Sequence, residues 1–388
     1  MAQYTRSLVS HLEGAVKRWP AVVLTGPRRA GKTHLLRRCF PQATYRLLED
    51  PDVVARVRAD PHGFLDDLRG PVILDEIQNV PELFAHVRAR IDGTTRRNGR
   101  WLITGSQDFA LMHGVSESMS GRAAVFRLLP LSVRELGRWD LLRGGYPEVW
   151  LHPRHATQWF SSYVQTYLER DVRSVTAVRD LGTFRRFVAL LATRCGQMLN
   201  KTDLAAPLGV SVPTITQWLS VLETTGLIVM VSPWYENLGK RIVKTPKVYW
   251  LDVGLLVHLL GFEDARALER SPLIGPVFES FVASELVKRA VGEGRSAELY
   301  WFRDHQGLEV DFVLPARNGE IELVEAKWTR TPTPPMARAM LELAPRFTAS
   351  RVHCTVIHPA KAGSGTDDVA LAPGARAMTI ERYFLAPR

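Results

Sequence analysis

One short run near the start of the chain constrains its fold more than any other feature: residues 26–33 read Gly-Pro-Arg-Arg-Ala-Gly-Lys-Thr. An apolar run at 22–24 precedes it, and a helical pattern over 32–38 begins inside it. Glycines let the backbone curl so that N–H groups converge on one point, and the start of a helix adds a field that favours anions. The spacing G-x-x-x-x-G-K-T between a strand and a helix therefore predicts a loop that binds nucleotide phosphates.

The predicted loop gives a role to its polar side chains. We expect Lys32 to reach the β- and γ-phosphates of ATP, and Thr33 to ligate Mg²⁺. The predicted nucleotide contacts are Gly26, Pro27, Arg28, Arg29, Ala30, Gly31, Lys32, Thr33 and His34. ATP and Mg²⁺ are thus the expected cofactors.

A second apolar run, residues 72–74, ends in two acids, Asp75 and Glu76. Behind a phosphate-binding loop, the first acid of such a pair is expected to bind Mg²⁺, usually through water. The second is placed to orient and polarise the attacking water. Asp75 and Glu76 are therefore the predicted catalytic acids, together with Lys32.

Further polar residues follow the next two apolar runs. Thr104 and Ser106 come after the run 101–103, and Ser106 is our preferred contact for the γ-phosphate. Arg122 begins the following run. Three roles stay open for Arg122: action on the γ-phosphate in its own chain, the same action in a neighbouring chain, or a solvated surface arginine.

The order of apolar runs predicts the fold class. Short runs at 22–24, 45–48, 72–74, 101–103 and 124–126 alternate with helical segments, which favours a parallel α/β sheet covered on both faces. The length of 388 residues suggests several domains. We divide the chain into an N-terminal helix (1–20), an α/β phosphate-binding domain (21–130), a helical lid (131–195), a small unit (196–260) and a second α/β unit (265–388).

These motifs give the chain a resemblance to the AAA-type P-loop ATPases, and more narrowly to a widespread prokaryotic family of uncharacterised ATP-binding proteins. The resemblance implies an ATPase domain followed by a C-terminal domain of unknown function that is related in sequence to PD-(D/E)XK nucleases. No second sensor arginine is obvious, so ring assembly, and with it a homo-oligomer, stays open. The resemblance is carried by GPRRAGKT (26–33), ILDEIQ (73–78), ITGSQ (103–107), SGRAAVFRLLPLSVREL (120–136), GGYPE (144–148), YLERDV (167–172), VFESFVASEL (277–286), LEVDFVL (308–314) and VEAK (324–327).

The small unit is predicted to be a winged helix. Residues 201–211 and 212–223 indicate helix, turn and helix, and 226–231 and 247–251 indicate two returning strands. Four basic residues in and beside the loop between the strands are candidate contacts with DNA phosphates: Lys240, Arg241, Lys244 and Lys247. The formal net charge of +10 also allows a nucleic-acid partner. The alternative is a winged helix that serves only as a lid or a protein contact.

The C-terminal unit carries acids on neighbouring predicted strands. Asp311 lies on one strand and Glu325 and Lys327 on the next, and a preceding helix supplies Glu279. The set resembles the D…E-x-K arrangement of PD-(D/E)XK nucleases. Its carboxylates suit a second Mg²⁺ or Mn²⁺, and Lys327 would stabilise the attacking hydroxide. The alternatives are exposed strand charges or a nuclease-like fold that has lost catalysis.

Two functions follow from these readings. The first is an Mg²⁺-dependent ATPase acting on nucleic acid, and the second is an ATP-dependent switch whose nuclease-like domain is inactive and binds protein. The three cysteines form no C-x-x-C pair, so neither a disulfide framework nor a zinc site is indicated. Charged residues within 1–19 predict no signal peptide, and the sequence predicts no membrane span, so a reducing cytoplasmic setting is expected.

Overall fold

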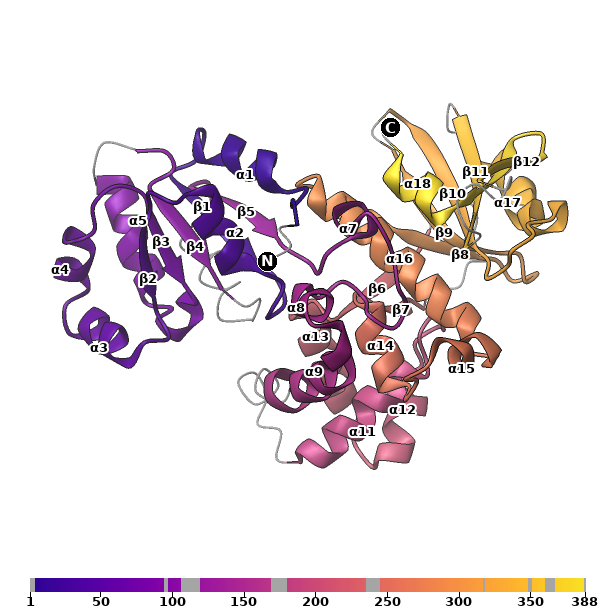
Figure 1. The fold of residues 1–388 in the computed structure, drawn as a ribbon, viewed down its shortest axis with the longest axis horizontal. Coiled ribbons are helices and arrows are strands. Elements are labelled where there is room, and N and C mark those ends of the chain that lie inside the picture. The colour runs from indigo at the N-terminus through magenta and orange to yellow at the C-terminus, as the bar shows by residue number, and fades with distance from the viewer. Residues whose placement is uncertain are drawn as a thin grey trace.

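The structure, a computed structural model, describes residues 4–93, 97–105, 119–168, 180–234, 245–316, 318–347, 351–359 and 367–386. Figure 1 shows two lobes, with the N-terminal sheet and its helices at the left and the remaining elements at the right. In the part that the structure describes, no helix combines the length and the apolarity that a membrane crossing needs.

A five-stranded parallel sheet forms the N-terminal lobe, as the apolar runs predict. Its strands follow the spatial order β2-β3-β4-β1-β5. They are β1 (Ala21–Thr25), β2 (Thr44–Leu47), β3 (Val72–Asp75), β4 (Trp101–Thr104) and β5 (Ala123–Arg127). β1, β3 and β4 are buried along their whole length, which fits their apolar sequences up to the polar residue that ends each strand.

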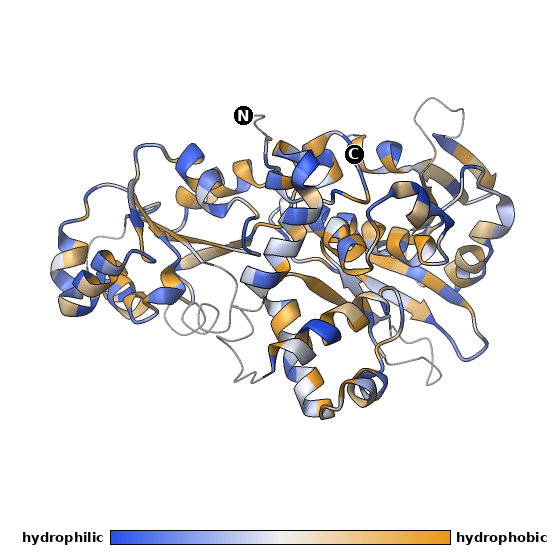
Figure 2. Ribbon diagram, turned by 60° about the horizontal axis from the view of Figure 1, so that its bottom comes forward, coloured by the Kyte–Doolittle hydropathy of each residue, from blue (hydrophilic) through white to orange (hydrophobic). Residues whose placement is uncertain are grey.

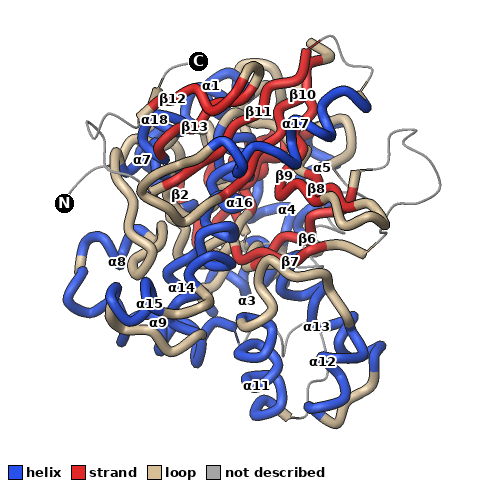
Figure 3. The backbone as a smooth tube through the Cα atoms, turned by 90° about the vertical axis from the view of Figure 1, so that its right-hand side faces the viewer, coloured by secondary structure: helices blue, strands red, loops and turns tan. Residues whose placement is uncertain are grey.

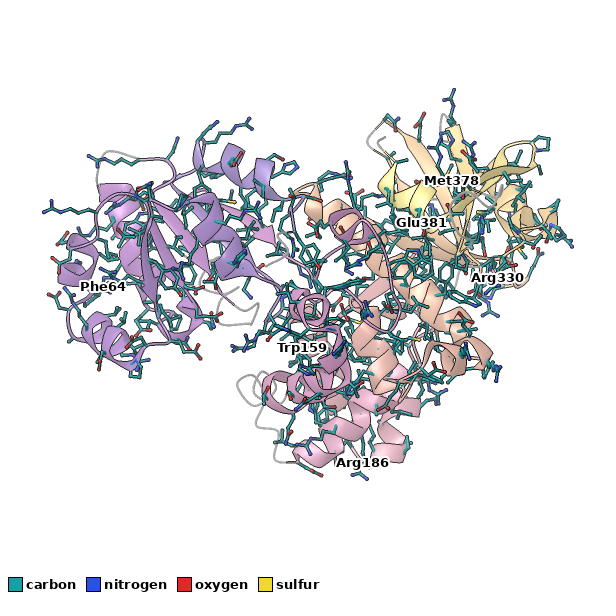
Figure 4. All side chains as sticks on the ribbon, in the orientation of Figure 1. Phe64, Trp159, Arg186, Arg330, Met378 and Glu381 are labelled. Carbon is teal, nitrogen blue, oxygen red and sulfur yellow. The ribbon has the colours of Figure 1, made fainter. Side chains whose placement is uncertain are left out.

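Helices cover both faces of this sheet. α1 (Val9–Val16) and α2 (Lys32–Cys39) pack on one face through Leu12 and Leu36. α3 (Pro51–Ala59), α4 (Pro61–Asp66), the 3-10 turn η1 (Ile77–Asn79) and α5 (Leu83–Gly93) pack on the other, where Phe64 lies in the core (Figure 4). In Figure 2 the sheet is mainly hydrophobic, as a doubly covered sheet must be.

The N-terminal helix is shorter than the predicted 1–20. α1 begins only at Val9, and Arg6 and Ser7 before it bind another part of the chain. Arg6 Nε donates to Glu135 (3.2 Å), and the backbone N–H of Ser7 donates to the same carboxylate (2.8 Å). Arg6 and Ser7 are thereby fixed to α7 (Val133–Leu136).

The segment after β5 is mainly helical, as predicted for the lid, and is anchored to later helices. It contains α7, α8 (Pro147–Leu151), the 3-10 turn η2 (Pro153–His155), α9 (Ala156–Tyr163), the π-helical turn η3 (Val164–Leu168) and α11 (Leu181–Ala192). The backbone N–H of Val133 donates to Glu285 (2.7 Å), and that of Gly145 donates to Asp252 (2.7 Å). Trp139 also donates to Glu381, which Figure 4 labels near the C-terminus.

Helix, turn, helix and two strands follow in the predicted order. They are α12 (Lys201–Leu208), α13 (Val212–Thr224), β6 (Ile228–Pro233) and β7 (Lys247–Trp250), and β6 and β7 pair antiparallel. Ser211 caps α13 by accepting a hydrogen bond from the N–H of Thr214 (3.2 Å). Ile215, Leu219 and Leu222 form the buried face of α13.

These two strands also belong to the C-terminal sheet, which the predicted division at 260–265 separates from them. β6 pairs in parallel with β8, and the eight strands follow the order β12-β13-β11-β10-β9-β8-β6-β7 (Figure 3). The other strands are β8 (Tyr300–Arg303), β9 (Glu309–Pro315), β10 (Glu320–Ala326), β11 (Arg351–His358), β12 (Asp368–Ala372) and β13 (Ala375–Thr379). A large apolar core runs through this lobe from Leu129 to Phe384, and a second, smaller cluster packs α17 (Arg338–Leu343) against the C-terminal strands.

Long and short helices complete the second lobe. α16 (Ile274–Gly292) is the longest, and its middle is buried. The others are α14 (Val253–Leu259), α15 (Ala265–Arg270), α17 (Arg338–Leu343) and α18 (Ile380–Leu385), with 3-10 turns η4 (Pro334–Ala337) and η5 (Ala344–Arg346).

Candidate nucleotide-binding site

The phosphate-binding loop joins β1 to α2 at the carboxyl end of β1, which lies between β4 and β5. Gly26 has φ +138° and Gly31 has φ +96°, conformations that side chains disfavour. A Cβ atom on Gly26 would lie 2.1 Å from the carbonyl oxygen of Leu128. Glycine at position 26 therefore lets the loop pack directly against the residue that follows β5.

Lys32, the first residue of α2, folds its side chain back over the loop that precedes the helix. Its side chain is buried, and its ammonium group donates to the carbonyl oxygens of Gly26 (2.9 Å) and Pro27 (3.1 Å). The positive charge therefore lies where the loop is predicted to receive phosphates. The remaining predicted contacts surround it, with Ala30 buried, Arg28 half-buried, and Arg29 and His34 exposed.

Thr33 and Asp75, the two predicted Mg²⁺ residues, meet at the carboxyl end of β3. The Thr33 hydroxyl lies 3.0 and 2.9 Å from the two carboxylate oxygens of Asp75. The pair fits an Mg²⁺ ion that takes oxygen ligands from protein, water and phosphates. Such a site needs few carboxylates, and among the described residues no group of three or more His, Cys, Asp or Glu side chains is placed to hold a metal.

Two further hydroxyl groups hold Asp75 in place, and one of them has little signal in the sequence. Tyr45 donates to Asp75 Oδ2 (2.7 Å), and Thr104 donates to Asp75 Oδ1. Burial and the bond to Asp75 raise the pKa of Tyr45 above its usual value, so the phenol remains a donor even well above neutral pH. Tyr45 could have been found only from the adjacency of β2 and β3, which place Leu47 opposite Asp75.

Glu76 follows Asp75 in a left-handed backbone conformation, with φ 58° and ψ 48°. Its N–H donates to Thr104 (3.3 Å), its carbonyl accepts from Asn79 (3.0 Å), and its carboxylate accepts from Gln78. A non-glycine residue in this conformation is strained, and such strain gathers at functional sites. The surroundings thus hold Glu76 in one orientation beside the Thr33–Asp75 pair.

The structure treats the other two catalytic candidates, Ser106 and Arg122, differently. Ser106 lies outside the described residues, whereas Thr104 contacts both Asp75 and Glu76. Arg122 precedes β5, and it forms two hydrogen bonds with Asp92 (2.6 and 2.8 Å). β5 runs parallel to β1, so the loop lies at the opposite end of the sheet, about 15 Å away at roughly 3.3 Å per residue. A role for Arg122 on the γ-phosphate in its own chain is therefore wrong, and the role in a neighbouring chain stays a prediction.

Arg6 supports the loop from behind, and sequence reasoning missed it. Its Nη1 donates to the carbonyl oxygen of Ala30 (3.2 Å), its Nη2 to that of Leu129, and its Nε to Glu135 (3.2 Å). Burial lowers the pKa of Arg6, and Glu135 opposes that effect. One buried side chain thus connects the start of the chain, the phosphate-binding loop and the segment after β5.

The C-terminal acids come together, as the D…E-x-K pattern predicts. Asp311 Oδ2 accepts from the N–H of Ala326 (3.0 Å) and lies 3.5 Å from Lys327 Nζ. Lys327 Nζ also lies 2.5 Å from Glu325. Burial and Asp311 raise the pKa of Glu279 to about 7, and they raise that of Glu325 well above its usual value.

Lys247 completes this cluster, which corrects one prediction. Its ammonium group is buried and lies 3.1 Å from Glu279 and 2.7 Å from Glu309, so it is not a contact for DNA phosphates. The first residue of β7 lies inside the sheet rather than in a basic wing. The predicted metal set of Glu279, Asp311 and Glu325 stays a prediction: in the described part of the chain, Lys247 lies against Glu279 and Lys327 against Glu325, and no group of three or more His, Cys, Asp or Glu side chains is placed to hold a metal.

The other predicted DNA contacts, Lys240, Arg241 and Lys244, lie outside the described residues. On α13, Thr216 and Gln217 are exposed, whereas Thr214 is half-buried. The three cysteines, Cys39, Cys195 and Cys354, are free thiols.

Comparisons with known proteins agree with the geometry of the N-terminal lobe. Residues 18–137 match a family described as an AAA domain. Residues 137–266 and 274–377 match two families, each described as a domain of unknown function (DUF8612 and DUF4143). Among solved structures, the Walker-type ATPase of Pyrococcus abyssi is 16% identical, with a TM-score of 0.42 over 65% of this chain and 94% of that one.

Two curated relatives match most of the chain. Uncharacterized proteins of Mycobacterium bovis and Mycobacterium tuberculosis are each 35% identical over 346 residues, which is 86% of this chain and 76% of each relative. The AAA match covers the sheet, the loop and both acids described above. The N-terminal lobe is thus an AAA-type P-loop domain, which supports ATP binding, and the chain belongs to the same family as these two mycobacterial proteins.

Proposed function

We propose that this chain is an Mg²⁺-dependent ATPase. The observation that carries the proposal is the contact between Thr33 at the start of α2 and Asp75 at the end of β3, with Lys32 and Glu76 beside it. The four side chains come from two separate motifs. Their convergence at the carboxyl edge of the sheet supports one site for ATP and Mg²⁺.

Each residue has a defined part in the proposed hydrolysis. Thr33 and Asp75 would hold Mg²⁺, which supplies positive charge to the phosphate oxygens when it is bound. Lys32 exchanges the carbonyl oxygens of Gly26 and Pro27 for phosphate oxygens. Glu76 takes a proton from the attacking water, whose oxygen forms a bond to the γ-phosphorus as the bond to the β-γ bridging oxygen breaks. The products are ADP and inorganic phosphate.

Phosphate release by the purified full chain tests this proposal. We expect turnover with ATP and Mg²⁺, and none when Mg²⁺ is chelated. Lys32→Ala should abolish both tight ATP binding and turnover, because it removes the charge on the phosphates. Arg56→Ala is a suitable control, since Arg56 is exposed and pairs with Asp67 far from the loop. A folded Lys32→Ala protein that binds ATP as tightly as the wild type would remove the assignment.

The proposed target of the ATPase is nucleic acid, through a winged helix formed by α12, α13, β6 and β7. The order of these elements, the exposed Thr216 and Gln217, and the net charge of +10 support this reading. ATP turnover should rise when duplex DNA is added. The affinity for DNA should also fall steeply with salt if lysines and arginines contact phosphates. A rate of ATP turnover that does not change when DNA is added at low salt would count against this target.

The second candidate is an ATP-dependent switch whose nuclease-like domain is catalytically inactive and binds protein. Lys247 favours it, because an internal ammonium group lies against Glu279 and Glu309 in the cluster where a nuclease needs a metal. A nicking assay on supercoiled DNA with Mg²⁺ or Mn²⁺ separates the candidates. The switch predicts no cleavage, and cleavage that Asp311→Asn abolishes would exclude it.

A further inference from the structure

Arg127 ends β5 beside the phosphate-binding loop. It pairs in register with Thr25, the residue directly before that loop. A Cβ atom placed on Gly226 would lie 2.8 Å from Arg127 Nη2 and 3.1 Å from Pro27 Cδ. Because a single point is that close to both, the guanidinium group, Pro27 of the loop and the turn from α13 to β6 meet at one place.

Two of the three guanidinium nitrogens of Arg127 are buried without hydrogen-bond partners, although the residue as a whole is half-buried. Nε and Nη2 are shielded from solvent, and in the part of the chain that the structure describes neither makes a hydrogen bond. Burial lowers the pKa of Arg127, and Glu223 acts in the opposite direction. Glu223, near the end of α13, nevertheless forms no ion pair with Arg127 in the described part of the chain. An arginine keeps its charge at neutral pH, so this burial opposes folding.

Arg6 provides the contrast. It lies at the same junction, and all three of its guanidinium nitrogens are hydrogen-bonded to Ala30, Leu129 and Glu135. Arg6 therefore has the contacts of a structural arginine, and Arg127 does not. A buried cation that opposes folding beside a phosphate-binding loop has its natural partner in a phosphate.

We propose that Arg127 binds the phosphates of the nucleotide held by the loop, and that it transmits nucleotide binding to the turn from α13 to β6. The proposal rests on the ATP binding proposed above. Gly226, with φ +77°, leaves the space that the guanidinium group occupies in this turn. A bound phosphate would draw the group toward Pro27 and away from Glu223, which changes the contact between the two lobes.

Arg127→Met tests the first part, because methionine fills similar space without charge. The variant should melt at a higher temperature than the wild type without nucleotide, since an unpaired buried charge is removed. Its affinity for ATP, measured by calorimetric titration with Mg²⁺, should fall at least tenfold. Arg6→Met is the matched control and should melt at a lower temperature. An Arg127→Met protein that melts lower and binds ATP as the wild type does would make Arg127 structural and overturn the proposal.

Hydrogen exchange tests the second part. ATP should change the exchange of the backbone amides of residues 222–228 in the wild type and leave them unchanged in Arg127→Lys, which keeps the charge but not the forked geometry. An equal response in both proteins would overturn the link between the lobes. If the wild type binds ATP, Lys32→Ala does not, and Arg127→Met binds it fully, then the proposed function stands and the inference about Arg127 fails. No ATP binding by the wild type would defeat the proposed function and this inference with it.

Discussion

At the scale of single residues, the site is organised around one carboxylate. Asp75 accepts hydrogen bonds from the hydroxyl groups of Thr33, Tyr45 and Thr104, which come from α2, β2 and β4. Thr104 also accepts the N–H of Glu76. Moving Asp75 would therefore disturb the residue that follows it, and the two acids are coupled through Thr104.

Replacing Glu76 by glutamine separates ATP binding from hydrolysis. The amide keeps the size of the side chain but cannot take a proton from water. We expect Glu76→Gln to bind ATP with the affinity of the wild type and to lose turnover by about 100-fold or more. Glu82→Gln is the control, since Glu82 is partly exposed and pairs with Arg58. If steady-state phosphate release by Glu76→Gln equals that of the wild type, Glu76 is not the base for the attacking water.

At the scale of elements, the loop between β1 and α2 depends on glycine. Gly26→Ala places a methyl group against the carbonyl oxygen of Leu128 at a backbone angle that alanine disfavours. We expect it to lower the free energy of unfolding by more than about 2 kcal/mol and to weaken ATP binding. Gly14→Ala in α1 meets no atom within 4 Å and should raise that free energy by roughly 0.5–1 kcal/mol. Urea denaturation of both variants measures the two changes in the free energy of unfolding. Equal changes in Gly26→Ala and Gly14→Ala would contradict the prediction.

α16 carries Glu279 into the buried acid cluster, and this gives stability a pH dependence. The pKa of Glu279 is about 7 in the folded chain and near 4.5 in a free side chain, so the folded state binds the proton more tightly. Its contribution to stability is therefore complete below about pH 4.5 and is lost as the pH rises through 7.

Glu279→Gln should remove that dependence. Between pH 5 and 8 the wild type should lose stability relative to the variant, by no more than about 3 kcal/mol in total. Urea denaturation at several pH values measures the difference. A difference that stays constant across this range would mean that Glu279 does not titrate there.

At the scale of the whole molecule, the two lobes have separate cores. Two clusters fill the two faces of the N-terminal sheet, whereas the large core of the second lobe begins at Leu129. We expect calorimetry to show two unfolding transitions. In Glu76→Gln, ATP with Mg²⁺ should raise the melting temperature of the N-terminal lobe more than that of the second lobe. At an ATP concentration of 100 times the Kd, the free energy of unfolding of the N-terminal lobe should rise by about 2.7 kcal/mol. A single transition would show that the lobes unfold as one unit.

The sequence predicted the local parts of this architecture and missed the long-range ones. Residues 26–33 and the run ending at Asp75 each determine their own strand and loop, so the P-loop lobe could be foreseen. The pairing of β6 with β8, the burial of Lys247 and the position of Arg127 depend on residues far apart in the chain. No spacing along the chain reports such contacts, and a basic residue beside a loop looks solvated until its partners are known.

The pairing of β6 with β8 also decides how the protein can be dissected. A fragment that starts at residue 265 lacks β6 and β7, so β8 becomes an open edge strand. Trp301 is fully buried in the intact chain, and its carbonyl oxygen accepts a hydrogen bond from the N–H of Trp234. The fragment would lose this hydrogen bond. Exposed apolar edges pair with other chains, so such a fragment should aggregate. Studies of the C-terminal sheet are better done on a chain that retains β6 and β7.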